Sequence, residues 1–325
     1  MDLTSGKIIW QKTAREELPH EGHHKDASFA SSSPVTDGKH VWASFGSRGL
    51  HCYRVDGEHV WSIELDKMQT RNSFGEGASP ALTGDAVIVP MVHEGDSYII
   101  AVNKKTGKDI WKKPRDERTG WSTPLVLEVD GKLQAVVNAA NRVRSYDIKT
   151  GEVVWECGGQ TVSAVPTPVS GQGMVFCTSG FRGAALLAIQ LGKTGDLTGS
   201  DAVVWEANEA TPYVPSPLLY GERIYVCSGN KAVISCYQAV DGKPHYVKQR
   251  LEGMTGIYVS PVAAAGRIYF VGRGGMTKVI EPGNAFKILA ENKLDDAFAT
   301  TPAIVGDEIL LKGKKSLYCI AASGT

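Results

Sequence analysis

The most polar stretch of the chain, HEGHHKDASFASSSP at residues 20–34, carries the side chains best suited to binding a metal ion. His20, His23 and His24 could supply imidazole nitrogens, and Glu21 or Asp26 could add a carboxylate oxygen. The H-x-x-H-H spacing has no helical or strand context that would hold the imidazoles together, and short motifs often match by accident. We therefore expect no metal here, and a solvated loop is the competing interpretation.

Aromatic and charged residues also gather in the short segments that precede seven Ser-Pro or Thr-Pro pairs, as in FGEGASP, RTGWSTP and GIYVSP. Aromatic faces combined with a few charges suit a small polar ligand or a peptide. The competing interpretation is that these side chains only fill the centre of the fold. The candidate binding residues are Phe29, Glu76, Arg118, Trp121, Tyr213, Tyr258 and Phe298, with His24, Lys25 and Arg71 nearby.

Other signals of catalysis are missing from the sequence. There is no P-loop and no G-x-S-x-G elbow, and GRGGMTK lacks the following helix that phosphate binding needs. The six cysteines lie singly, and Cys52, Cys236 and Cys319 occupy one matching position in three similar strands. Other copies of that strand carry Ala or Ser there, so small size is the shared requirement. Buried packing residues are favoured over disulfides.

Composition narrows the range of partners. Lys plus Arg and Asp plus Glu both number 35, so the formal net charge is zero and nothing attracts a nucleic acid. No apolar run approaches the roughly 20 residues of a membrane-spanning helix. The start of the chain also lacks the basic and apolar segments of a signal peptide. We expect neither nucleic-acid binding nor membrane insertion.

The elements that position the candidate residues follow from an internal repeat. The Ser-Pro and Thr-Pro pairs recur at intervals of 41 to 49 residues. Each pair is followed by a turn and an apolar strand, a second short strand, and a strand that often ends in an aromatic residue. The prolines are Pro34, Pro80, Pro124, Pro168, Pro217, Pro261 and Pro302, and the repeated tryptophans are Trp10, Trp61, Trp111, Trp155 and Trp205.

A period near 44 residues with about four short strands per unit is typical of propeller blades of the WD40 kind. The segments show no helical periodicity. We therefore predict an all-β chain in which residues 1–325 form a single β-propeller of seven four-stranded blades. The tryptophans recur at one repeat position, which indicates packing rather than five active sites.

The seventh repeat has only three predicted strands, and the first eleven residues match a fourth strand. We expect Lys7–Gln11 to pair beside the strand SLYCI and to close the last blade, since closure removes exposed sheet edges. A longer parent protein would leave room for an eighth blade.

The unit small-x-Asp-x-x-Thr-Gly-x-x-x-Trp resembles the repeat of PQQ-type (pyrroloquinoline quinone) β-propellers. Its best copies run from Ser145 to Trp155 and from Ala101 to Trp111, and the resemblance covers essentially the whole chain. The family includes quinoprotein dehydrogenases and the propeller subunit of the bacterial outer-membrane β-barrel assembly machinery. In such propellers, the resemblance implies, the tryptophan docks on the neighbouring blade. Gln238 departs from the pattern by replacing the Asp.

The resemblance implies two alternative functions. The first is a non-catalytic, monomeric scaffold, periplasmic or secreted, that binds a protein, peptide or glycan at the mouth of the central channel. The second is an oxidoreductase or hydrolase with a pocket at that mouth. Quinoprotein dehydrogenases use an adjacent cysteine pair, a tryptophan beneath PQQ, Ca²⁺ ligands and a catalytic Asp. Because this chain has no adjacent cysteines, we expect no cofactor and favour the first function.

Overall fold

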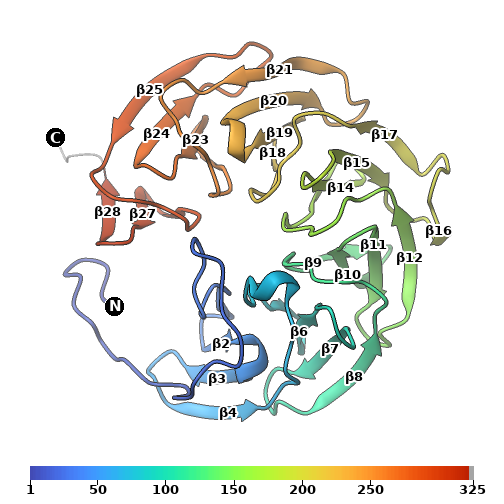
Figure 1. The fold of residues 1–325 in the computed structure, drawn as a ribbon, viewed down its shortest axis with the longest axis vertical. Helices are drawn as coiled ribbons and strands as arrows, with labels where there is room; N and C mark the ends of the chain where they lie inside the picture. Colours follow the sequence, from blue (N-terminus) through green and yellow to red (C-terminus); the bar gives the residue numbers. More distant parts are fainter. Residues whose placement is uncertain (322–325) are drawn as a thin grey trace. The chain divides into compact units, whose positions relative to one another are not determined.

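The computed structural model describes residues 1–321, and strands dominate its regular structure (Figure 1). Seven sheets follow one another along the chain, and the protein is an all-β, seven-bladed β-propeller, as the repeat predicts. Three short 3₁₀ turns are assigned in this part of the chain: η1 (Gly46–Arg48), η2 (Arg71–Ser73) and η3 (Gly229–Lys231). None of the helices among the described residues has the length and apolar character needed to cross a membrane.

The first sheet contains β1 (Val35–Thr36), β2 (His40–Ser44), β3 (Leu50–Arg54) and β4 (His59–Ile63). The second contains β5 (Ala81–Thr83), β6 (Ala86–Met91), β7 (Tyr98–Asn103) and β8 (Asp109–Pro114). The third contains β9 (Leu125–Val129), β10 (Lys132–Asn138), β11 (Arg142–Asp147) and β12 (Val153–Gly158), together with β16 (Gly195–Asp196).

The fourth sheet contains β13 (Val169–Gly171), β14 (Met174–Ser179), β15 (Ala185–Gln190) and β17 (Val203–Ala207). The fifth contains β18 (Leu218–Tyr220), β19 (Arg223–Ser228), β20 (Val233–Gln238) and β21 (Pro244–Arg250). The sixth contains β22 (Val262–Ala264), β23 (Arg267–Val271), β24 (Met276–Ile280) and β25 (Ile288–Lys293), and the seventh contains β26 (Ala303–Val305), β27 (Glu308–Lys312) and β28 (Leu317–Ala321).

Contacts divide the chain into two compact units, residues 1–137 with 145–154 and residues 138–144 with 155–325. In the first unit, Trp42, Leu50, Val87 and Ile100 pack between the first and second sheets. In the second unit, Tyr225, Ile234, Phe270 and Ile280 pack between the fifth and sixth sheets. In each case the buried cluster joins consecutive sheets.

The small residue of the third strand lies opposite the aromatic residue of the fourth. The register pairs Cys52 with Trp61, Ala101 with Trp111, Ala188 with Trp205 and Cys236 with Tyr246. Side chains of directly paired residues are neighbours on one face of a sheet. A larger side chain at the small position would collide with the aromatic ring, which explains why Cys, Ala and Ser alternate there.

Three of the repeated tryptophans also contact the turn of the following blade. Trp111 Nε1 donates to the carbonyl oxygen of Ile148 at 2.7 Å, and its ring covers Gly151 so closely that a Cβ there would lie 2.6 Å away. Trp61 and Trp205 make the same pair of contacts with Lys104 and Gly107, and with Ala239 and Gly242. These glycines have positive φ, so both backbone conformation and space demand Gly at this turn.

The Ser-Pro and Thr-Pro pairs link consecutive blades through their hydroxyl groups. In the first unit, the amide of Ser33 donates to Ser79 Oγ (2.9 Å), and that of Ser79 to Thr123 Oγ1 (3.3 Å). In the second unit, the amides of Thr167, Ser216 and Ser260 donate in turn to the hydroxyls of Ser216, Ser260 and Thr301 at 3.0, 2.9 and 3.3 Å. The repeat therefore requires a hydroxyl-bearing residue before each proline.

The N-terminal segment differs from the closing strand that the sequence predicts. Among the described residues, 1–34 contain no strand, and the seventh sheet has three strands. Asp2 instead closes a turn by accepting hydrogen bonds from the amide and hydroxyl of Ser5, and Ile8 and Ile9 are exposed. Trp10 nevertheless donates to Val55 O at 2.8 Å and covers Gly57, as Trp61, Trp111 and Trp205 do with their own turns. The strand expected at Lys7–Gln11 is therefore not formed in the described residues.

Candidate functional site

An irregular segment, which we call the N-terminal strap and define as residues 12–34, is bonded to the first sheet and to the loop 64–80 that follows it. The strap contributes nothing to the buried clusters of the described residues, so it is held by polar contacts. These join Arg15 to Glu64 (2.8 Å), Glu17 to Arg48 (2.7 Å), Glu21 to Thr70 (2.5 Å), the amide of His24 to Phe74 O (2.9 Å) and Ser32 Oγ to Ala78 O (2.9 Å).

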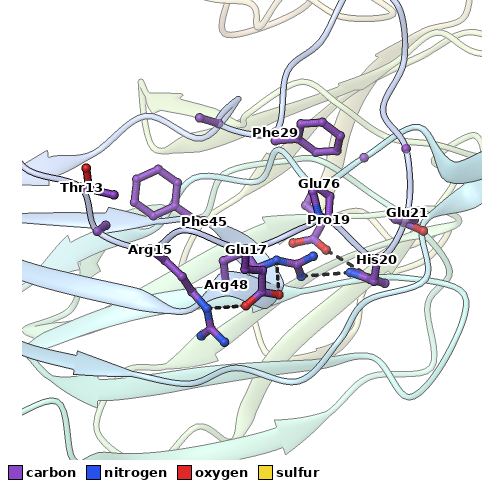
Figure 2. Close-up of a pocket in the computed structure, with 14 residues that line it drawn as sticks. Thr13, Arg15, Glu17, Pro19, His20, Glu21, Phe29, Phe45, Arg48 and Glu76 are labelled. Carbon is purple, nitrogen blue, oxygen red and sulfur yellow. Dashed lines mark hydrogen bonds and ion pairs between the residues drawn. The ribbon is translucent and has the colours of Figure 1, made fainter.

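A cavity of about 360 Å³, the strap pocket, lies between the strap and the first sheet. Its walls are mainly apolar, and Figure 2 shows the rings of Phe29 and Phe45 on one side and a row of charged side chains on the other. A pocket of this size fits the lower end of the range for small-molecule sites. The lining residues are Thr13, Ala14, Arg15, Glu17, Pro19, His20, Glu21, Gly22, Phe29, Ala30, Phe45, Arg48, Gly75 and Glu76.

One carboxylate of the pocket pairs with both of its arginines. Glu17 lies 2.5 Å from Nε of Arg15 and 2.7 Å from Nε of Arg48. Arg15 also reaches Glu64 outside the pocket at 2.8 Å. The guanidinium groups are thus engaged by carboxylates that belong to the protein itself, which leaves little positive charge to attract an anion.

His20 is locked in one neutral tautomer by its two partners. Its Nε2 lies 2.6 Å from the carbonyl oxygen of Met68, which only accepts, so Nε2 carries the proton. Its Nδ1 lies 3.0 Å from Nη1 of Arg48, which only donates, so Nδ1 accepts. Neither nitrogen is available as a metal ligand or as a general base without breaking one of these hydrogen bonds.

Two further carboxylates of the pocket have only neutral hydrogen-bond donors among the described residues. Glu76 accepts from the amide and the hydroxyl of Ser47, both at 2.5 Å. Glu21 accepts from the amide of Thr70 at 3.1 Å and from its hydroxyl at 2.5 Å. Ligand atoms of Glu21, Glu76 and His20 lie within 4.8 Å of one another. This end of the pocket therefore carries negative charge.

A glycine allows the carboxylate of Glu76 to approach the first sheet. Gly46 begins η1 with φ of +57°, and a Cβ at this position would lie 1.7 Å from Glu76 Oε2. A side chain there would be strained by the backbone and would collide with the carboxylate. The sequence FGSRG therefore shapes both the 3₁₀ turn and the floor of the pocket.

The candidate binding residues from the sequence fall into several environments. In the first unit, Phe29 and Glu76 line the strap pocket, and Trp121 donates to the carbonyl oxygen of the lining Gly75 at 2.8 Å. His24 packs edge-on against Phe74, and its Nδ1 accepts from the amide of Asp26. The other three residues of this unit lie outside the pocket lining: Lys25 and Arg118 are exposed, and the amide of Arg71 donates to Thr119 Oγ1.

The remaining candidates belong to the second unit. Tyr213 stacks on Phe181, with ring centroids 5.1 Å apart, and the guanidinium of Arg273 lies 4.4 Å from the ring of Tyr258. Phe298 is buried with Val259, Val271 and Leu311, so it is a core residue and not part of a binding surface. Sequence reasoning did not single out Arg15, Glu17, Phe45 and Arg48, because their neighbourhood depends on the path of an irregular segment.

The residues of the chain do not fit a PQQ and Ca²⁺ site of the quinoprotein kind. No two cysteines are adjacent in the sequence. Among the described residues, the one cluster of three or more metal-ligand side chains is His20, Glu21 and Glu76, whose imidazole is fully engaged. A metal ion there would have only the two carboxylates as charged ligands.

Sheets that are linked within each unit by tryptophan docking and by Ser/Thr-Pro hydroxyls are typical of a β-propeller of PQQ-like repeats. The sequence model of the family described as outer membrane protein assembly factor BamB matches residues 1–244, and the chain belongs to this family. A search of curated proteins found no significant match.

Solved structures share the fold at low sequence identity. BamB from Moraxella catarrhalis superposes with a TM-score of 0.68 at 15% identity, over 89% of this chain and 84% of that one. A europium-containing methanol dehydrogenase gives 0.67 at 11%, over 95% and 78%. The C-terminal WD40 domain of Sif2 gives 0.62 at 10%, over 90% and 81%. These similarities establish the fold.

Proposed function

We propose that the chain is a non-catalytic binding module that holds a protein partner on the periplasmic side of the outer membrane. The observation that carries this proposal is the family match over residues 1–244, whose description is that of an outer membrane protein assembly factor. A propeller suits such a role because it presents many loops from a rigid frame. Protein partners are the class that the match favours over a peptide or a glycan.

The state of the reactive side chains supports a binding role. His20 is held as a neutral tautomer between Met68 and Arg48. Burial raises the pKa of the Cys52 and Cys236 thiols to about 11, so both stay protonated and poorly nucleophilic at neutral pH. Neither group is prepared for acid–base or nucleophilic catalysis.

The candidate binding residues predicted from the sequence indicate where we expect the partner to bind. Arg118 is highly accessible in the first unit, with 85% of its side chain exposed and Glu94 3.9 Å away. Trp121 lies close by in sequence and is half-buried. In the second unit, Tyr258 and Tyr213 are half-buried aromatic residues. Aromatic and arginine side chains are the usual energetic centres of protein interfaces.

Co-elution with purified outer-membrane barrel-assembly proteins of the same source tests the proposal. We expect a complex that Arg118→Ala and Tyr258→Ala weaken at least about tenfold, with an unchanged melting temperature. Val204→Ser, on the exposed side of β17, is the control and should bind normally. The proposal fails if no complex forms, or if incubation with PQQ and Ca²⁺ produces dye-linked alcohol oxidation.

A further inference from the structure

We propose that the strap pocket binds a primary ammonium group carried on an apolar body, such as an arylalkylamine. This inference goes beyond the partner-binding role, because the pocket could take its ligand whether or not a protein partner is bound. It stands on the apolar cavity itself and on the charges that face into it.

The apolar part of the ligand is defined by the walls. Phe29, Phe45, Pro19, Ala14 and Ala30 line the cavity, and the two phenylalanines lie on the side opposite the charged row (Figure 2). Phe29 remains 52% exposed, so its ring has apolar surface that a ligand could cover. An apolar body in the cavity would bury these rings.

The net charge of the side chains that line the pocket predicts the charge of the ligand. Three carboxylates and two guanidinium groups face the cavity, so one negative charge is in excess when His20 is neutral. The guanidinium groups of Arg15 and Arg48 are both satisfied by Glu17. Glu21 and Glu76 have no arginine or lysine within ion-pair distance in the described part of the chain. The excess charge is therefore at their end.

An ammonium group matches the carboxylate oxygens of Glu21 and Glu76 better than a bare metal ion does. It donates three hydrogen bonds, which match carboxylate oxygens that keep unused lone pairs beside the Ser47 and Thr70 donors. A metal ion would need imidazole or water ligands in addition, and both nitrogens of His20 are already bonded. The nearby phenylalanines also favour an organic cation over a hydrated one.

Ligand-observed NMR titration with three matched probes tests the proposal. The probes are 4-phenylbutylamine, its neutral N-acetyl derivative and 4-phenylbutyrate, which share the apolar body and differ in charge. We expect the amine to bind at least about tenfold more tightly than either analogue, the value of a hydrogen-bonded charge pair. Glu76→Gln and Phe29→Ala should each weaken amine binding about tenfold.

Glu94→Gln is the matched control. Glu94 accepts from the hydroxyl of Thr119 at 2.7 Å and from its amide at 3.3 Å, as Glu21 does from Thr70, but it lies outside the pocket lining. It should leave amine binding unchanged. The proposal is overturned if all three probes bind equally, if Glu76→Gln has no effect on a folded protein, or if Ca²⁺ or Zn²⁺ alone binds at the pocket and excludes the amine.

Discussion

The blades and the N-terminal strap are built on opposite principles. In the blades, repeated residues have matching partners, as Trp111 has Ile148 and Gly151 and Trp205 has Ala239 and Gly242. The strap has no regular element and lies outside the buried clusters, yet it provides most of the lining of the pocket. The comparison shows that repetition supplies the stability of this molecule, whereas the non-repeated segment supplies the distinctive chemistry.

Among the changes considered, removal of a repeated tryptophan should lower the stability of the blades most strongly. Trp155 is 1% exposed, and Trp155→Ala should lower the free energy of unfolding by roughly 3–5 kcal/mol, through lost burial and the cavity left behind. Urea denaturation followed by circular dichroism measures the change. A loss below about 1 kcal/mol would show that the repeat position does not carry the stability of the blades.

Deletion of residues 1–11 should have the next largest effect. It removes Trp10, which stacks near Tyr53 and donates to Val55 O, and it uncovers Gly57. We expect a loss of about 2 kcal/mol, because the burial of the Trp10 ring and its hydrogen bond are lost. Thermal unfolding measures the change. An unchanged melting temperature would show that the Trp10 contact does not stabilise the first blade.

The Ser/Thr-Pro hydroxyls should contribute less per residue. Ser216→Ala removes the acceptor of the Thr167 amide at 3.0 Å, and an unpaired amide costs about 1–2 kcal/mol. Ser216→Thr keeps the hydroxyl and is the matched control, since other copies of the repeat carry Thr at this position. Equal stability of the two variants would show that the hydroxyl of Ser216 does not stabilise the propeller.

Release of one strap contact should barely affect global stability. Glu17→Ala leaves the half-buried Arg48 without its carboxylate, and a pair in which both side chains keep some contact with solvent contributes about 1 kcal/mol. The local effect should be larger, because Leu18 is 91% exposed and its neighbours lose their anchor. Limited proteolysis should cut the strap faster, whereas Glu64→Ala, at the periphery, serves as a milder comparison. Unchanged cleavage would mean that other contacts hold the strap.

The blades could be predicted from the sequence, but the pocket could not. Proline spacing and the Trp positions defined seven units because each residue repeats one local environment, and the cross-strand pairs such as Cys52 with Trp61 explain the small residues. Phe29 and Glu76 were singled out by type and position, and both line the pocket. Phe45 and Arg48 were not, since their place depends on tertiary contacts of the strap rather than on periodicity.

The closing strand was the least accurate expectation for the same reason. The segment around Lys7 matches the local repeat, yet strand formation also requires a paired edge, and the described residues 1–11 form a turn and an irregular segment instead. Trp10 keeps the tryptophan contact because that contact needs only a side chain and the turn at Gly57. A local motif thus predicts a docking residue better than it predicts a strand.

Replacement of residues 12–31 by a Gly/Ser linker of equal length separates the stability of the blades from the formation of the strap pocket. If the blades are stable without the strap and the strap creates the pocket, the free energy of unfolding should fall by about 2 kcal/mol or less, because polar surface contacts contribute little. Binding of 4-phenylbutylamine should be lost. Unfolded blades, or unchanged amine binding by the folded replacement, would contradict these expectations.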